Sequence, residues 1–184
     1  GTVIFKEKRV DDFWNTLIDN KTDIKWQCNV RACDHPDELI RKMRKAGCKA
    51  VYLGIESGSP DMLKKMQKGI TLTTIEKTIE QFRRYRIFCM AFILFGCPDE
   101  TEEDMNATLI YLNNSKADAI WMNTVIPLPG SDYYGQLESD GQINDDFPWD
   151  TMSYRNSDLI FCKNVYLEQF QEIINQAIKI IDRK

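Results

Sequence analysis

Apolar residues along this chain form four short runs, separated by segments in which they recur at helical spacing. The runs cover residues 24–30, 50–55, 88–95 and 119–126 and are rich in branched and aromatic side chains, as strands are. Runs this continuous are typical of strands buried on both faces of a parallel sheet. Because a helical segment joins each strand to the next, we expect right-handed crossovers and an α/β fold with the strands neighbouring one another in chain order.

The helical segments carry recognisable start signals. We expect helices over residues 8–20, 34–47, 59–67, 73–82, 101–112 and 161–181, the last of them amphipathic. Four helices begin at residues whose side chains can accept hydrogen bonds from the first free N–H groups: Asp34, Ser59, Thr73 and Thr101.

Glu56 is the most informative candidate for chemistry, because it ends a buried run and precedes a Gly/Ser/Pro cluster. Polar or glycine-rich clusters also follow the other strands, near Arg31, Gly96 and Pro127. In a parallel α/β fold these strand ends meet at one edge of the sheet, where ligands bind. Glu56 can equally be a solvated loop carboxylate before a helix that Ser59 caps. No Gly-x-Gly-x-x-Gly or Walker-type loop is present, which removes the commonest nucleotide sites.

The composition is that of a globular domain with one sizeable core. The chain has 184 residues, of which 43% are hydrophobic. It carries 24 basic and 28 acidic residues, so a nucleic-acid or membrane-surface role has no electrostatic support, and no apolar run has membrane-spanning length. The six cysteines are scattered without a Cys-x-x-Cys pair, as in reduced cytoplasmic proteins, so we expect a cytoplasmic protein and no metal site within this chain.

Six motifs, in consistent order over roughly residues 8–147, resemble those of the radical S-adenosylmethionine (radical SAM) enzymes. They are Trp26-Gln27-Cys28-Asn29-Val30-Arg31, Lys45-Ala46-Gly47-Cys48, Gly54-Ile55-Glu56-Ser57-Gly58-Ser59, Met66-Gln67-Lys68-Gly69-Ile70-Thr71, Gly96-Cys97-Pro98-Asp99-Glu100-Thr101 and Pro127-Leu128-Pro129-Gly130-Ser131. The most similar members carry an N-terminal cobalamin-binding domain or are described as Fe–S oxidoreductases. Each motif alone is weakly specific, whereas six in order are specific.

The resemblance implies the family's fold, a partial TIM-like (β/α)6 barrel with an iron–sulfur cluster at its carboxyl-terminal face. Residues 1–147 would be its third to sixth βα units, and residues 148–184 a C-terminal loop and helical extension. The family's Cys-x-x-x-Cys-x-x-Cys loop is missing from this chain. We therefore expect a fragment, inactive alone, of an enzyme that cleaves S-adenosylmethionine at a 4Fe–4S cluster. A cobalamin cofactor in a missing domain, with methyl-transfer chemistry, also fits the resemblance.

The resemblance assigns roles to three residues at the polar end of the cofactor. Glu56 and Ser57 match the strand end that contacts the ribose and the amino acid part of S-adenosylmethionine. Lys68 matches the basic residue of the family's Met-x-Lys/Arg-Gly segment, which faces the cofactor carboxylate, and a cation opposite a carboxylate is electrostatically sensible. Composition alone would favour a solvated lysine at a helix end.

Five further residues complete the implied cofactor site. Ile93 and Gly96 match the strand segment that backs the adenine, where glycine allows a close approach of the backbone. Asn29 and Arg31 end the first predicted strand of this chain, and Pro127 follows the fourth. Arg31 could bind the cofactor or the substrate, or form an ion pair with an acidic residue on the surface.

Two other function classes stay open. One is an ordinary TIM-barrel lyase, although no lysine lies within a strand core and no phosphate loop is recognisable. The other is a non-catalytic α/β module that binds a partner. The substrate, a small or lipid-like molecule, is not specified by the sequence, because its groove belongs to loops such as residues 145–158. An uncovered edge beside residues 24–30 favours a homodimer.

Overall fold

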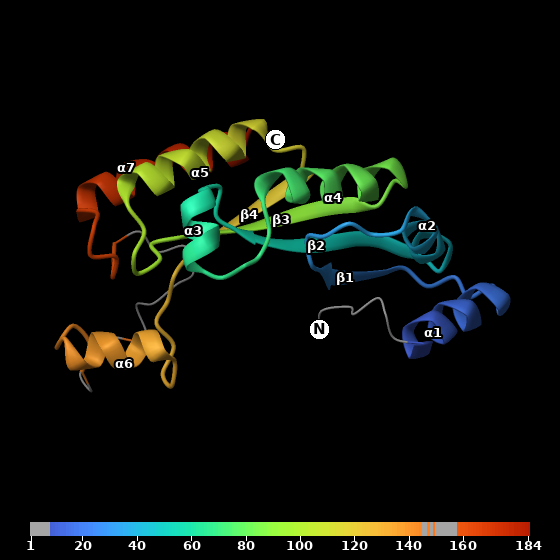
Figure 1. Ribbon diagram of the computed structural model, residues 1–184, viewed down its shortest axis with the longest axis horizontal. Helices are drawn as coiled ribbons and strands as arrows, with labels where there is room; N and C mark the ends of the chain where they lie inside the picture. The colour runs from blue at the N-terminus through green and yellow to red at the C-terminus, as the bar shows by residue number, and fades with distance from the viewer. Residues whose placement is uncertain (1–7, 145–146, 148, 150–157) are drawn as a thin grey trace.

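The computed structural model describes residues 8–144, 147, 149 and 158–184. Within them, the sheet consists of β1 (Trp26–Val30), β2 (Cys48–Glu56), β3 (Phe88–Phe95) and β4 (Ala119–Thr124). The strands pair in parallel in the order β1-β2-β3-β4 (Figure 1). The predicted α/β architecture and the neighbour order of the strands are therefore confirmed, and the carboxyl ends of all four strands meet at one edge.

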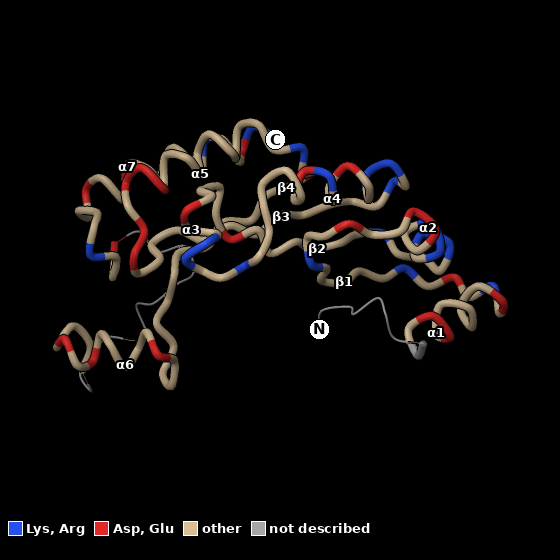
Figure 2. The backbone as a smooth tube through the Cα atoms, viewed as in Figure 1, with Lys and Arg blue, Asp and Glu red and all other residues tan. Residues whose placement is uncertain are grey.

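The helices are α1 (Lys8–Asp19), α2 (Asp37–Lys45), α3 (Pro60–Lys65), α4 (Leu72–Arg84), α5 (Glu102–Asn114), α6 (Asp132–Ser139) and α7 (Leu167–Ile181). Figure 1 places α4, α5 and α7 along one face of the sheet and sets α6 apart from this layer. Figure 2 shows that α2 begins with acidic residues and ends with basic ones, an order that suits the helix dipole.

Among the described residues, helices cover only one face of the sheet (Figure 1), so the expectation of strands buried on both faces is wrong. In β2, Val51, Leu53 and Ile55 are completely buried beneath the helices. Tyr52 and Gly54, which alternate with them, point to the opposite face and are half-buried. The prediction failed because the open face also carries apolar side chains. These side chains line a cavity and do not pack against a second layer of helices.

Two of the predicted helix starts are confirmed. The Ser59 hydroxyl accepts a hydrogen bond from the Met62 N–H at 3.2 Å, and Pro60 occupies the first helical position of α3. Thr101 and Asp104 form the expected capping box of α5. Both starts fix the loops that follow β2 and β3, at the edge where the candidate site lies.

Two other predicted caps are wrong because tertiary contacts use the side chains differently. Helix α4 is capped by Thr71, not by Thr73, and the Glu76 carboxylate accepts hydrogen bonds from Tyr111 and from the end of α5. Asp34 does not cap α2, because this helix begins only at Asp37. The Asp34 carboxylate instead accepts a hydrogen bond from Gln81 of α4 at 2.9 Å.

The C-terminal part holds a second cluster that the sequence pattern did not reveal. Its buried residues are Leu137 of α6, Ile143 and Phe161, and Phe147 and Trp149 pack against them. Helix α7 begins at Leu167, later than predicted, and packs into the main core. Residues on both sides of position 147 thus share one cluster. No helix of the described residues is long and apolar enough to cross a membrane.

Candidate cofactor-binding site

A cavity of about 650 Å³ opens on the uncovered face of the sheet, at the carboxyl ends of β1, β2 and β3. Its floor includes Tyr52, Phe92 and Leu94, and the rings of Tyr52 and Phe92 meet edge to face. Its rim is polar. Of the eight predicted site residues, Asn29, Arg31, Glu56 and Lys68 line this cavity. A polar rim above an apolar floor is typical of a small-molecule site.

Glu56 and Lys68 form an ion pair at the rim, with 2.9 Å between the Lys68 Nζ and the Glu56 Oε1. Their side chains are 22% and 30% exposed, so water screens the pair and it adds at most about 1 kcal/mol to folding stability. Lys68 reaches the rim because the chain turns sharply after α3, where Gln67 and Gly69 have φ values of 52° and 63°.

The backbone of Glu56 is in a left-handed conformation, with φ at 73°. The pairing of β2 with β3 also slips here, because Gly54 faces Phe92 while Glu56 already faces Ile93, so Ile55 is the extra residue of a β-bulge. A left-handed non-glycine residue costs on the order of 1–2 kcal/mol, and such residues cluster at functional sites. The residue pattern around Glu56 does not indicate this strain.

Arg31 reaches across the cavity mouth to the loop that carries Lys68. Its Nη2 donates a hydrogen bond to the Lys68 carbonyl oxygen at 3.0 Å. A Cβ at Gly69 would lie 3.8 Å from the same Nη2, which is ordinary van der Waals contact, so the positive φ of Gly69 rather than the space around it accounts for the glycine. The guanidinium therefore holds the main chain of the loop while the Lys68 side chain meets Glu56.

The other four predicted residues do not line the cavity. Ser57 is buried behind the strand, where its hydroxyl lies 3.2 Å from the Thr108 hydroxyl of α5. Ile93 is completely buried on the helix side of β3, while its neighbours in the strand form the cavity floor. Gly96 packs against Phe170, and Pro127 is buried after β4.

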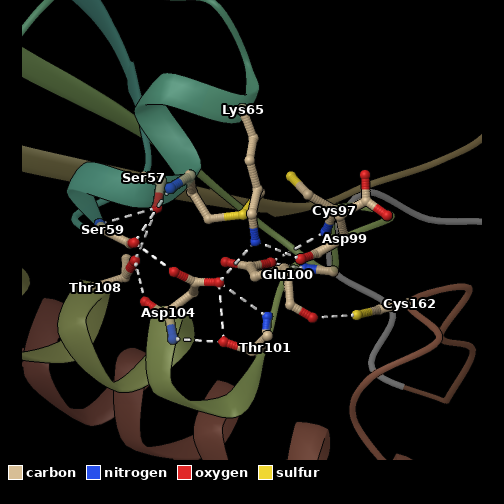
Figure 3. Close-up of polar contacts among 12 residues, drawn as sticks. Ser57, Ser59, Lys65, Cys97, Asp99, Glu100, Thr101, Asp104, Thr108 and Cys162 are labelled. Atoms are coloured by element: carbon tan, nitrogen blue, oxygen red, sulfur yellow. Dashed lines mark hydrogen bonds and ion pairs between the residues drawn. The ribbon is translucent and has the colours of Figure 1, made fainter.

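Glu100 is a buried carboxylate near the site whose role sequence reasoning missed, having treated it only as part of a helix start. Its side chain is completely buried, and its Oε2 accepts hydrogen bonds from the N–H groups of Gly96 and Cys97 at 2.7 and 3.0 Å (Figure 3). Its Oε1 has no hydrogen-bond partner among the described residues. Burial raises the pKa of Glu100 to about 7, against the opposing effect of the two backbone hydrogen bonds.

Asp104 is an acidic neighbour of Glu100, but its pKa is shifted in the opposite direction. Burial would raise its pKa, but hydrogen bonds from Ser59 and Thr101 lower it below its ordinary value. The Lys65 ammonium also lies 3.5 Å from Asp104 and donates to the Asp99 carbonyl at 2.9 Å (Figure 3). This network ties α3 to the start of α5 and fixes the loop that follows β3.

The described residues do not offer a set of ligands for an iron–sulfur cluster. Among them, no three His, Cys, Asp or Glu side chains come together as a metal site would require. Two of the thiols are also unsuited to ligation, because burial raises the pKa of Cys89 to about 12 and that of Cys97 further. A cluster therefore does not fit this part of the chain.

The family described as the Radical SAM superfamily matches residues 3–112 of this chain. Among curated proteins, the chain is 28% identical over 130 residues to the "Uncharacterized methyltransferase PH0819" of Pyrococcus horikoshii, covering 71% of this chain and 28% of that protein. It is 25% identical over 137 residues to the bacteriochlorophyllide d C-12(1)-methyltransferase of Chlorobaculum tepidum, covering 73% and 30%. The chain thus spans under a third of either relative.

Solved structures show the same fold at low sequence identity. Coproporphyrinogen III oxidase (HemN) from Escherichia coli, titled a radical SAM enzyme, superposes with a TM-score of 0.64 at 14% identity, over 95% of this chain and 36% of that one. The methyltransferase TsrM from Kitasatospora setae, solved with cobalamin and a [4Fe–4S] cluster, gives a TM-score of 0.55 at 19% identity, over 62% and 24%. The partial TIM-like barrel implied by the motifs is confirmed.

Proposed function

Because the chain belongs to the radical SAM superfamily, we propose that it forms the later βα units of such an enzyme and that Glu56 and Lys68 hold the polar end of S-adenosylmethionine. Membership implies S-adenosylmethionine and a 4Fe–4S cluster as cofactors. The single observation that carries the proposal is the half-exposed ion pair of Glu56 and Lys68 at the rim of the cavity.

The charges of this pair are complementary to an amino acid end group. S-Adenosylmethionine ends in a carboxylate and an ammonium group, which can turn to Lys68 and Glu56 respectively. Exchanging a screened ion pair for two charge-assisted hydrogen bonds to a ligand sacrifices little, because the pair itself is weak in water. The apolar floor around Phe92 and Leu94 suits the less polar part of the molecule.

The cluster, when bound, supplies the electron that cleaves S-adenosylmethionine. Its ligands are not found in the described residues, so we propose that another part of the full-length protein provides them. The residues of this chain then act by binding and orientation. Glu56 and Lys68 fix the polar end of the ligand, and Arg31 holds the main chain of the Lys68 loop in place.

Methyl transfer is the reaction class we propose for the full-length protein. Two curated relatives are methyltransferases by name, and the solved structure of TsrM is titled a methyltransferase with cobalamin bound. A cobalamin cofactor held by a further domain is part of this proposal. Anaerobically purified full-length protein, expressed with cobalamin uptake, is expected to show a cobalamin absorption spectrum; a cobalamin-free protein under those conditions contradicts that part.

The binding role is tested in the full-length protein with its cluster reconstituted. Glu56→Ala and Lys68→Ala are each expected to weaken binding of S-adenosylmethionine roughly ten- to a hundred-fold, the loss of a charge-assisted contact. Iron content and circular dichroism should stay unchanged. Glu80→Ala, on the exposed face of α4, is the matched control and should leave the affinity as it is. Unchanged affinity in both site variants would overturn the assignment.

A further inference from the structure

We propose that Gly54 is a positioning residue, whose missing side chain leaves the space into which the Glu56 carboxylate folds to reach Lys68. The consequence for cofactor binding rests on the proposed function, whereas the effect on the ion pair does not. Gly54 lies in β2, two residues before Glu56, and both line the cavity. No backbone conformation explains the glycine, because Gly54 is not among the glycines with positive φ.

The space around Gly54 is filled by the two charged side chains. A Cβ at this position would lie 2.5 Å from the Glu56 Oε1 and 3.5 Å from its Cδ. It would also lie 3.8 Å from the Lys68 Nζ. A separation of 2.5 Å is far inside ordinary van der Waals contact, so any side chain at position 54 must displace the carboxylate that accepts from Lys68.

The fold of β2 explains why the carboxylate lies over its own strand. Residues two apart in a strand share a face, so Gly54 and Glu56 both face the cavity. Glu56 follows the bulge at Ile55 and has a left-handed backbone, and its carboxylate lies next to Gly54, in the space that a Cβ would occupy. Gly54, the bulge and the strained Glu56 thus act together to set the position of one charge.

A direct test of the geometry reads the accessibility of Lys68. In the full-length protein, the rate at which an amine-reactive acylating reagent modifies Lys68 is measured by peptide mass spectrometry. Glu56→Gln removes the ionic partner and should raise the rate roughly 1.5- to 5-fold, the range expected for a half-exposed ion pair. Gly54→Ala should raise it by a similar factor. Gly135→Ala, with open space around its Cβ, is the matched control and should change nothing. An unchanged rate in Gly54→Ala overturns the inference.

A double-mutant cycle on S-adenosylmethionine affinity tests whether Gly54 acts through Glu56. Gly54→Ala is expected to weaken binding about ten-fold, but to add no further loss in the Glu56→Ala background, because the carboxylate it displaces is already gone. Losses that add would mean that the new methyl group obstructs the ligand directly, which overturns the positioning role. If Lys68 reactivity rises while affinity is unchanged, the positioning role stands and the proposed function fails.

The stability of the same variants provides a third test. If Gly54→Ala lowers the yield or the thermal stability of the protein, it should cause no further loss in the Glu56→Ala background, because truncation at position 56 removes the clash. A defect that persists in the double variant would show that the side chain at 54 clashes with something other than Glu56, and would overturn the inference.

Discussion

Two carboxylates beyond or at the ends of neighbouring strands, Glu56 as the last residue of β2 and Glu100 in the loop after β3, are held in opposite ways. Glu56 is 22% exposed, sits on a strained backbone and meets a cation. Glu100 is completely buried, meets no cation in an ion pair among the described residues, and accepts hydrogen bonds from two backbone N–H groups. One edge of the sheet therefore carries one carboxylate that a ligand can reach and another that is buried and hydrogen-bonded to the protein backbone.

The difference separates stability from binding. A screened ion pair contributes little to folding, so the strain at Glu56 is not offset by stability and is better explained by a ligand. The hydrogen bonds of Glu100 satisfy donors that water cannot reach, so its removal should harm the fold rather than a ligand contact. Each of the following experiments tests one side of this contrast.

The largest effect is expected from Glu100→Ala. It leaves the N–H groups of Gly96 and Cys97 without an acceptor and opens a cavity, which together should lower the free energy of unfolding by about 3–5 kcal/mol. Urea denaturation at pH 6 measures it. Glu56→Ala in parallel should lose about 1 kcal/mol. A smaller loss for Glu100→Ala than for Glu56→Ala would break the contrast.

A second effect concerns pH. Burial raises the pKa of Glu100 to about 7 in the folded protein, above the unfolded value near 4.5, so the folded state binds more protons between these values. The contribution to stability is full below about pH 4.5 and is lost as the pH rises through about 7, with Asp104 adding to the raised pKa and Lys65 opposing it.

The free energy of unfolding of the natural chain should accordingly fall by about 2–3 kcal/mol, relative to Glu100→Gln, between pH 5 and pH 8. Glutamine keeps an acceptor oxygen but does not titrate, so the difference between the two proteins isolates this one group. Parallel pH profiles for the two proteins would show that Glu100 does not titrate in this range.

The strands were predictable because local pattern and tertiary position agree. Each apolar run became a strand in the expected order. Helix α6 was not predictable, because Leu137 is its only buried residue and its apolar partners, such as Phe161, come from elsewhere in the chain. Periodicity within one segment cannot reveal a face whose partners lie outside that segment.

The candidate site was predictable only in part, for a related reason. Motifs placed Glu56 and Lys68 at one edge, and the structure brings them together. Motifs did not say which face each residue would take: Ser57 turns to Thr108 of α5, and Ile93 turns to the helices. Those orientations depend on contacts between elements, as does the burial of Glu100.

The smallest effect is the most direct test of the contrast, because it measures whether the left-handed backbone conformation of Glu56 is strained. At φ of 73°, glycine is tolerated and alanine is strained, so Glu56→Gly should be about 1 kcal/mol more stable than Glu56→Ala. Both variants lack the ion pair, so their difference reports the backbone alone. Relief of strain should bring Glu56→Gly within about 1 kcal/mol of the natural chain in urea denaturation, while its affinity for S-adenosylmethionine falls as in Glu56→Ala. An alanine variant at least as stable as the glycine variant would mean that position 56 is unstrained, and the case for a ligand-driven conformation would rest on the ion pair alone.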